Sequence, residues 1–395
     1  CQRAIHRAMC EENQVLLRSF QLYFPAPPGY WREMHLLYLI AQRFGMLEQL
    51  CDDPEEKGWE SSIYEAYERA LLLATAKPNQ LRQQQSEQVH DAARYWAKFA
   101  SVTDAQSSSG LFAIDVTSDS PPIYQSLMKR STLPHNLRFF DASALSDHLR
   151  MLLQLPAGQQ HPVATFHAPD KFPNDLARIL IQAWGVLTER AFTRIDEHGQ
   201  LTLCLGLSAT HYFVSGRTDF NKMIQGGASI LEGDSANRFI QRGPTNRRDQ
   251  FESHDVWGPQ INRTVQVPDA AINYSIEQHT SDKLGEEKDK YPQYHCEVIN
   301  TSPGGFCLSW KQDVPPQVKT GEIVGIMEND KNHWSIGVIR WVKQFKNEGA
   351  RMGIELIAPK AEACGTQVVH KKGGVTEYMR TLMLPELRAI GQPAT

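Results

Sequence analysis

The sequence predicts an α+β protein with a helical N-terminal module, a mixed α/β middle region and a C-terminal antiparallel β-barrel that carries a long insertion. Three observations support this fold class. Apolar residues recur at three-to-four spacing in residues 1–103. Helix and strand patterns then alternate, and closely spaced short strands with turns follow, as in a barrel or sandwich. A chain of 395 residues is long enough for two or three domains.

Residues 1–103 are predicted to form a helical, repeat-like domain. The expected helices lie at 14–23, 31–45, 61–76 and 83–101. Proline-containing turns separate them, because proline cannot continue a helix. Alanines and aromatic residues are mixed in the third helix, as in helix-pair repeats, although no regular repeat length is present.

A serine-rich linker at 103–110 precedes a mixed α/β region at 110–187. The expected strands are 111–116 and 137–140, and the expected amphipathic helices are 143–155 and 174–187. Residues 199–214 are then predicted to be the first part of a strand-rich segment.

The barrel is expected at 188–360, followed by a C-terminal tail at 361–395. Its later strands are predicted at 294–299, 305–310, 323–328, 334–343 and 351–357. The polar stretch at about 216–292 is too long for a structureless loop inside a compact domain, so we interpret it as an insertion.

Composition narrows the class of protein. The net charge of −4 argues against a nucleic-acid polymer as partner. No run reaches the roughly 18 apolar residues of a membrane span and no signal pattern is present, so a cytoplasmic location is expected. The seven cysteines show neither a C-x-x-C pair nor a disulfide framework, which fits reduced thiols. The chain starts at Cys1 instead of a methionine, as a fragment of a longer protein would.

Asn300, Ser302, Gly304 and Gly305 lie between two expected strands. Glycines there let backbone press against a flat polar ligand, while the carboxamide and hydroxyl supply hydrogen bonds. The same residue types also form ordinary tight turns, so a plain turn is an equally good interpretation of this segment alone.

The arginine pair Arg190 and Arg194 precedes the first strand of the barrel region. Two guanidinium groups four residues apart can grip a phosphate or a guanine edge and can stack on a base. Two further pairs share this spacing, namely Arg3/Arg7 and Arg238/Arg242. Only Arg190/Arg194 leads through a short turn into a strand, but the sequence leaves Arg238/Arg242 open as the alternative.

Enzymatic interpretations have little support. His295 and Glu297 form an H-x-E motif without the P-C-x-x-C partner of zinc deaminases. Cys204 and His211 are seven residues apart on one expected strand, which puts them on opposite faces and prevents a Cys–His nucleophile; His211 is interpreted as a partly buried, hydrogen-bonded histidine. No G-x-S-x-G, H-E-x-x-H or Walker motif occurs. The sequence therefore predicts a protein that is not an enzyme and holds no cofactor or metal.

Taken together, Arg190-x-x-x-Arg194 and Asn300-x-Ser302-x-x-Gly305 resemble the signature of the PilZ domain, a bacterial receptor module for cyclic di-GMP. The segments 337–341 and 352–356 are similar to two later strands of that family. The resemblance covers about 188–360. It implies a long, atypical member, because over a hundred residues separate the two motifs where the family needs only a few tens.

This resemblance implies a non-enzymatic receptor that binds cyclic di-GMP and relays binding to an unidentified protein partner, in surface motility or biofilm control. Arg190 and Arg194 would bind guanine edges and phosphates, and Asn300 and Ser302 would hydrogen-bond the ligand. Gly304 and Gly305 complete the implied site, with Gly305 allowing close approach. The alternatives are an interaction scaffold whose barrel binds no nucleotide and, less well supported, a metal-dependent enzyme.

Overall fold

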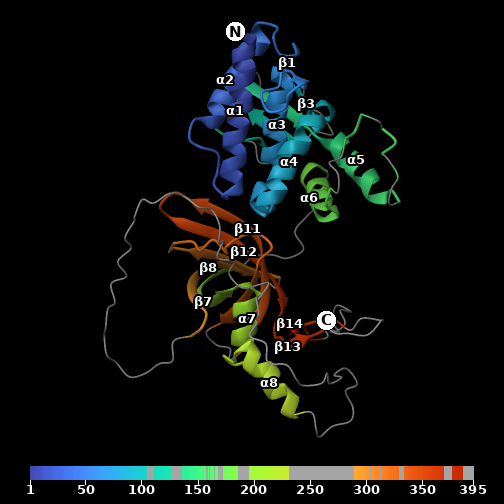
Figure 1. The fold of residues 1–395 in the computed structure, drawn as a ribbon. Coiled ribbons are helices and arrows are strands. Elements are labelled where there is room, and N and C mark those ends of the chain that lie inside the picture. The colour runs from blue at the N-terminus through green and yellow to red at the C-terminus, as the bar shows by residue number, and fades with distance from the viewer. Residues whose placement is uncertain are drawn as a thin grey trace, which may run out of the picture. The chain divides into compact units, whose positions relative to one another are not determined.

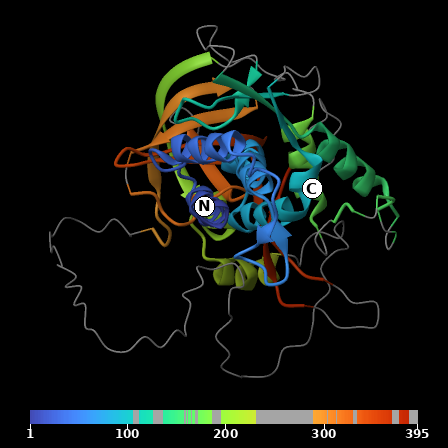
Figure 2. The ribbon, with the colours of Figure 1, turned by 90° about the horizontal axis from the view of Figure 1, so that it is seen from above.

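The computed structural model is drawn in Figure 1 and, turned by 90°, in Figure 2. It describes residues 1–104, 111–125, 136–156, 159, 161–163, 165–167, 172–185, 195–230, 289–302, 304–311, 313–328, 333–368 and 376–385. The chain divides into two compact units. The first comprises Cys1–His198, Val298–Gly321 and Ile339–Glu355, and the second comprises Gly199–Glu297, Glu322–Val338 and Leu356–Thr395.

The N-terminal helices confirm the predicted helical module. They are α1 (Gln2–Gln21), α2 (Tyr30–Arg43), α3 (Ile63–Thr75) and α4 (Gln83–Trp96). The other three helices pack against α3 (Figure 1). On α3, Ala66, Ala70, Leu71 and Leu72 have no exposed surface. A capping box starts α3, because the Ser62 hydroxyl accepts from the Glu65 amide at 3.1 Å and the Glu65 carboxylate accepts from the Ser62 amide at 2.8 Å.

Residues 1–103 are not helical throughout, and here the prediction was wrong. Strands β1 (Cys51–Asp52) and β2 (Glu60–Ser61) form a short hairpin between α2 and α3. The last predicted helix ends at Trp96, and β3 (Ser101–Thr103) joins the next sheet. Strands this short carry no periodic signal in the sequence.

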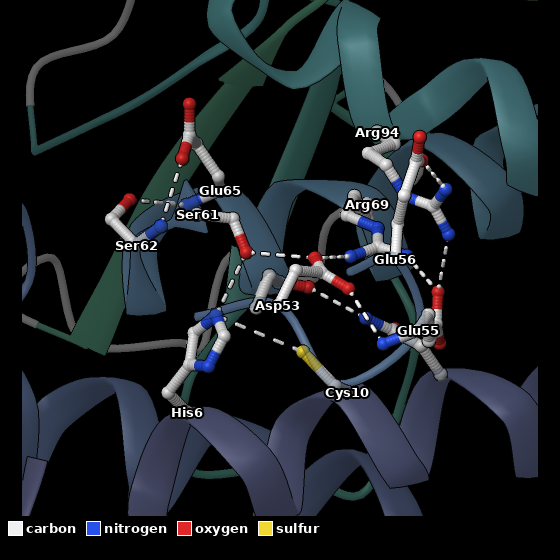
Figure 3. A network of polar contacts seen from close by, with 12 residues as sticks. His6, Cys10, Asp53, Glu55, Glu56, Ser61, Ser62, Glu65, Arg69 and Arg94 are labelled. Atoms are coloured by element: carbon white, nitrogen blue, oxygen red, sulfur yellow. Dashed lines mark hydrogen bonds and ion pairs between the residues drawn. The ribbon is translucent and has the colours of Figure 1, made fainter. Parts of the chain in front are cut away.

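A buried polar network holds the β1–β2 hairpin against the helices (Figure 3). Arg69 Nη1 on α3 donates to Asp53 Oδ2 at 3.0 Å, and the Ser61 hydroxyl donates to the same oxygen at 2.9 Å. Arg69 also pairs with Glu55, which accepts from Arg94 Nη2 of α4 at 2.9 Å. The Arg69 and Asp53 side chains are fully buried, so this ion pair lies out of contact with water.

Glu68 on α3 is a second buried charged residue, and it forms no ion pair with a cationic side chain in the described part of the chain. Both carboxylate oxygens are shielded from water, and neither has a hydrogen-bond partner in the described part of the chain. Burial raises the pKa of Glu68 well above 4.5. The neighbouring Tyr64 hydroxyl lowers the pKa of Glu68, but by less than burial raises it. This hydroxyl donates to the Val102 carbonyl oxygen and accepts from the Val102 amide.

Replacing Glu68 with methionine should stabilise the protein at alkaline pH. The folded chain binds the Glu68 proton more tightly than the unfolded chain, so the free energy of unfolding falls as pH rises above 4.5. We expect Glu68→Met to remove this decline and to add about 1 to 3 kcal/mol at about pH 8, the cost of a buried unpaired polar group. Urea unfolding followed by helical circular dichroism at about pH 5 and about pH 8 measures both effects.

The matched control is Glu87→Met on α4, where the carboxylate is exposed. It should change the free energy of unfolding by no more than about 0.5 kcal/mol. A Glu68→Met protein that is less stable than the wild type at alkaline pH would contradict this account of Glu68.

The middle region contains the two predicted strands and the two predicted helices, but its sheet has four strands because β3 and β5 join it. The strands follow the order β3-β6-β4-β5, with β4 (Phe112–Asp115), β5 (Ile123–Tyr124) and β6 (Leu137–Asp141). Helices α5 (Ser143–Gln154) and α6 (Asn174–Trp184) pack on each other. Trp184 lies edge-on to Trp96 of α4 and donates its indole N–H to Thr75 Oγ1 at 3.0 Å. The helical module and the middle region therefore share one hydrophobic core.

The six-stranded antiparallel barrel confirms the predicted strands. It closes in the order β10-β11-β12-β9-β8-β7. Its strands are β7 (Ile195–Leu205), β8 (Tyr294–Ser302), β9 (Gly305–Trp310), β10 (Ile323–Glu328), β11 (Ser335–Phe345) and β12 (Gly349–Ala358). Strands β7 and β8 are neighbours in the barrel, and the predicted insertion at about 216–292 lies between them in the sequence.

Three further elements differ from the sequence prediction. The expected strand-rich run 199–214 is β7 followed by helix α7 (Gly206–Val214), since a short apolar run does not distinguish strand from helix. Helix α8 (Phe220–Ile230) lies within the predicted insertion. The segment described as a tail contains a hairpin of β13 (Glu362–Thr366) and β14 (Met379–Met383).

Two ion pairs join the chain on either side of residues 231–288, which lie outside the described residues. Arg217 Nε is 2.7 Å from Asp289 Oδ1, and Lys290 Nζ is 2.5 Å from Asp219 Oδ2. We call these four residues the insertion clasp. Within the described residues, no helix combines the length and apolar character needed to cross a bilayer.

Candidate ligand-binding site

A pocket of about 120 Å³ lies at the end of the β8–β9 hairpin. Four strands supply its lining: Asn300, Ser302, Gly304, Gly305, Phe306, Cys307, Arg340, Trp341, Gly353, Ile354 and Glu355. The motif residues predicted from the sequence between positions 300 and 305 therefore come together in one pocket. Their role in binding a ligand stays a prediction.

Gly305 is required by the packing of the barrel. Its φ angle is +144°, and a Cβ there would lie 1.9 Å from the carbonyl oxygen of Ile354 on β12. The register pairs Gly305 with Glu355, so the missing side chain lets β9 and β12 approach at the pocket.

Ser302 closes the turn between β8 and β9. Its hydroxyl donates to the Gly305 carbonyl oxygen at 3.4 Å, and Asn300 and Ser302 are both half-buried. Ser302 and Gly305 therefore belong to a turn and also line the pocket. The turn is thus present, and the ligand cradle stays a prediction.

The opposite wall contains residues that sequence reasoning did not assign to the site. The Trp341 indole lies on Gly353, where an added Cβ would be 1.9 Å from the indole nitrogen. Arg340 forms an ion pair with Glu355 across β11 and β12. Both strands were noted as matching the resembled family, but only the pairing of β12 with β9 brings them to the 300–305 turn.

This set of groups suits a flat polar ligand with negative charge. An arginine fork binds phosphate or a guanine edge, an indole provides a stacking surface, and carboxamide and hydroxyl groups supply hydrogen bonds. The volume is smaller than the roughly 300 Å³ of a typical enclosed small-molecule site. The pocket is therefore too small to enclose a whole drug-sized ligand.

Arg190 and Arg194 lie outside the described residues, as do Arg238 and Arg242. Strand β7 begins at Ile195, directly after the first pair. The strand directions alternate around the barrel, so β7 and β8 run antiparallel. Thr202 Oγ1 lies 3.1 Å from His295 Nδ1 across these strands, and this register brings the start of β7 close to the Ser302 end of β8.

Cys204 and His211 do not form a nucleophile pair. Burial raises the pKa of the Cys204 thiol to about 12, so it is not a thiolate at neutral pH. His211 lies on α7, not on a strand, and its Nε2 is 3.2 Å from the carbonyl oxygen of Cys364. This agrees with the predicted buried, hydrogen-bonded histidine.

The N-terminal network also contains a serine, a histidine and an aspartate (Figure 3). His6 Nε2 is 2.8 Å from Ser61 Oγ, but Asp53 contacts the serine and not the second nitrogen of the histidine. Ser61 is almost fully buried, so no substrate reaches it. Its geometry is that of a packing network and not of a hydrolase triad. Within the described residues, no cluster of histidine, cysteine and acidic side chains is arranged to hold a metal ion.

The chain matches three protein families along its length. Residues 1–107 match the family described as "Cyclic-di-GMP receptor FimW, N-terminal domain", and residues 111–363 match "Cyclic-di-GMP receptor FimW, middle PilZ domain". Residues 364–395 match "FimW C-terminal beta-barrel domain". The chain is similar to the cyclic-di-GMP receptor FimW of Pseudomonas aeruginosa strain PAO1, with 36% identity over 403 residues. That alignment covers the whole chain and 64% of the relative. No significant match to a solved structure was found.

Proposed function

Because the chain belongs to the family of the cyclic-di-GMP receptor FimW, we propose that it binds cyclic di-GMP at the pocket between β8, β9, β11 and β12. The observation that carries this proposal is the meeting of Asn300, Ser302 and Gly305 with Arg340 and Trp341 in one pocket. These groups match the chemistry of a ligand with two phosphate charges and two guanine faces.

Arg190 and Arg194 are proposed to complete the site. Support comes from the start of β7 at Ile195, whose register places this end of the strand near Ser302. Arginines just before β7 would need only a short reach to a ligand held at the 300–305 turn. They would supply the positive charge that the pocket needs, because Arg340 is already paired with Glu355.

Isothermal calorimetry with cyclic di-GMP tests the proposal. The wild type should bind near or below micromolar concentration, and the double variant Arg190→Ala/Arg194→Ala should bind at least about tenfold more weakly, because two charge-assisted contacts are lost. The matched control is Arg3→Ala/Arg7→Ala, which removes an arginine pair of the same spacing from α1 and should not change the affinity.

Two other results would change the interpretation. If Arg238→Ala/Arg242→Ala weakens binding and the first double variant does not, the alternative arginine pair takes part. If the wild type shows no binding at millimolar ligand, the scaffold interpretation replaces the receptor.

The proposed receptor acts without catalysis and without a cofactor, in the cytoplasm. Ligand binding would shift an equilibrium of binding to a protein partner. A role in surface motility or biofilm control belongs to the same proposal. A pull-down of the partner that responds to added cyclic di-GMP, and that is lost in the Arg190→Ala/Arg194→Ala variant, tests this step.

A further inference from the structure

We propose that Arg340 is an additional ligand-binding arginine, and that its ion pair with Glu355 holds it while the pocket is empty. Glu355 then lowers the affinity for an anionic ligand, because the ligand must displace it from Arg340. This inference rests on the proposed function and concerns how the same site is regulated.

The first support is position. Arg340 on β11 and Glu355 on β12 both line the pocket, and Arg340 Nε pairs with Glu355 Oε2. In the register of β12 with β9, Glu355 lies opposite Gly305. Glu355 therefore lies on the strand between Arg340 and the 300–305 turn, and its carboxylate occupies the guanidinium that an anionic ligand would need.

The second support is charge. Arg340 and Glu355 are the two ionised side chains among the residues that line the pocket, so together they leave its net charge near zero. A ligand with two phosphate charges gains from a free guanidinium and is repelled by a free carboxylate. When the ligand replaces Glu355 on Arg340, it gains the attraction of the guanidinium and the repelling carboxylate moves away. Both changes favour binding.

The third support is that the pair is easily exchanged. The side chains are 56% and 50% exposed, and solvent-exposed ion pairs contribute little to stability. A phosphate accepts from a guanidinium in the same forked geometry as a carboxylate, so Arg340 can exchange one anion for the other without losing hydrogen bonds. Arg69 and Asp53, which are fully buried, have no such freedom.

The test is a double-mutant cycle measured by calorimetry with cyclic di-GMP. Glu355→Gln should bind about two- to fivefold more tightly than the wild type, the range expected when an exposed ion pair no longer competes. Arg340→Gln should bind more weakly. In the Arg340→Gln background, adding Glu355→Gln should have a clearly smaller effect, because there is no arginine left to release.

A control separates this effect from a general change in charge. Asp147→Asn removes a carboxylate from another exposed ion pair, with Arg150 on α5, and should leave the affinity unchanged. The inference is wrong if Glu355→Gln binds equally or more weakly than the wild type, or if it binds more tightly by the same factor with and without Arg340. Wild-type protein that binds no cyclic di-GMP would overturn the proposed function together with this inference, whereas the results above would overturn the inference alone.

Discussion

Replacing Arg69 with methionine should destabilise the N-terminal helical module by about 3 to 5 kcal/mol, the usual cost of removing one partner from a buried ion pair. Arg69 donates to Asp53 at 3.0 Å and pairs with Glu55, and its side chain has no exposed surface. Without it, the buried Asp53 carboxylate loses the guanidinium that pairs with it directly. Thermal unfolding followed by helical circular dichroism measures the loss.

The same substitution should alter the response to acid. Burial acts to raise the pKa of Glu55, but Arg69, with Gln14, His90 and Arg94, outweighs it and holds the value at about 2. Glu55 therefore contributes stability that is fully present above pH 4.5 and is lost as pH falls toward 2. In Arg69→Met, the free energy of unfolding should fall less steeply over this interval.

Arg7→Met serves as the control for Arg69. Arg7 forms an exposed ion pair with Glu11 on α1, 3.7 Å apart, so its loss should cost no more than about 1 kcal/mol. Equal losses for the two variants would show that the buried network is not what holds the hairpin.

Replacing Gly305 with alanine should both destabilise the barrel and impair the pocket. The backbone there has a φ of +144°, and the new Cβ would lie 1.9 Å from the Ile354 carbonyl oxygen. Backbone strain alone costs about 1 to 3 kcal/mol, and β9 and β12 must also separate where they line the pocket. We expect a lower midpoint of thermal unfolding and binding of cyclic di-GMP that is at least about tenfold weaker.

Gly349→Ala distinguishes the two effects. Gly349 has a φ of +81°, and a Cβ there would lie 1.9 Å from the Trp310 carbonyl oxygen, but Gly349 does not line the pocket. This variant should lose similar stability and keep its affinity for the ligand below its unfolding transition. If both variants lose affinity to the same extent, Gly305 has no specific part in the site.

The sequence predicted the strands of the barrel because they are short apolar runs separated by polar connections, most of which contain glycine or proline. The same pattern identified Asn300 to Gly305, since a turn motif is local in sequence. Helix α7 was not predicted, because an apolar nine-residue run after β7 fits both periods. The β1–β2 hairpin was missed because two-residue strands depend on the contacts of Asp53 and Ser61, not on a pattern.

The second wall of the pocket could not be predicted for a different reason. Arg340, Trp341 and Glu355 reach the turn only because β12 pairs with β9 in the barrel, although these two strands are not consecutive in the sequence. A single sequence does not contain that pairing. Side chains alternate between two faces in the strand at 337–341. Together with the assumption that the strands close into a barrel, this alternation could have suggested the pairing.

The insertion clasp allows the segment between its two ends to change in length without a change in the geometry of the barrel. Arg217 is paired with Asp289 and Asp219 with Lys290, so the two attachment points lie side by side next to the paired strands β7 and β8. In general, halving the length of a loop changes the free energy of closing it by only about 0.6 kcal/mol. Relatives can therefore gain or lose sequence at this point with little thermodynamic penalty, and a reporter domain inserted there should leave β7 and β8 paired.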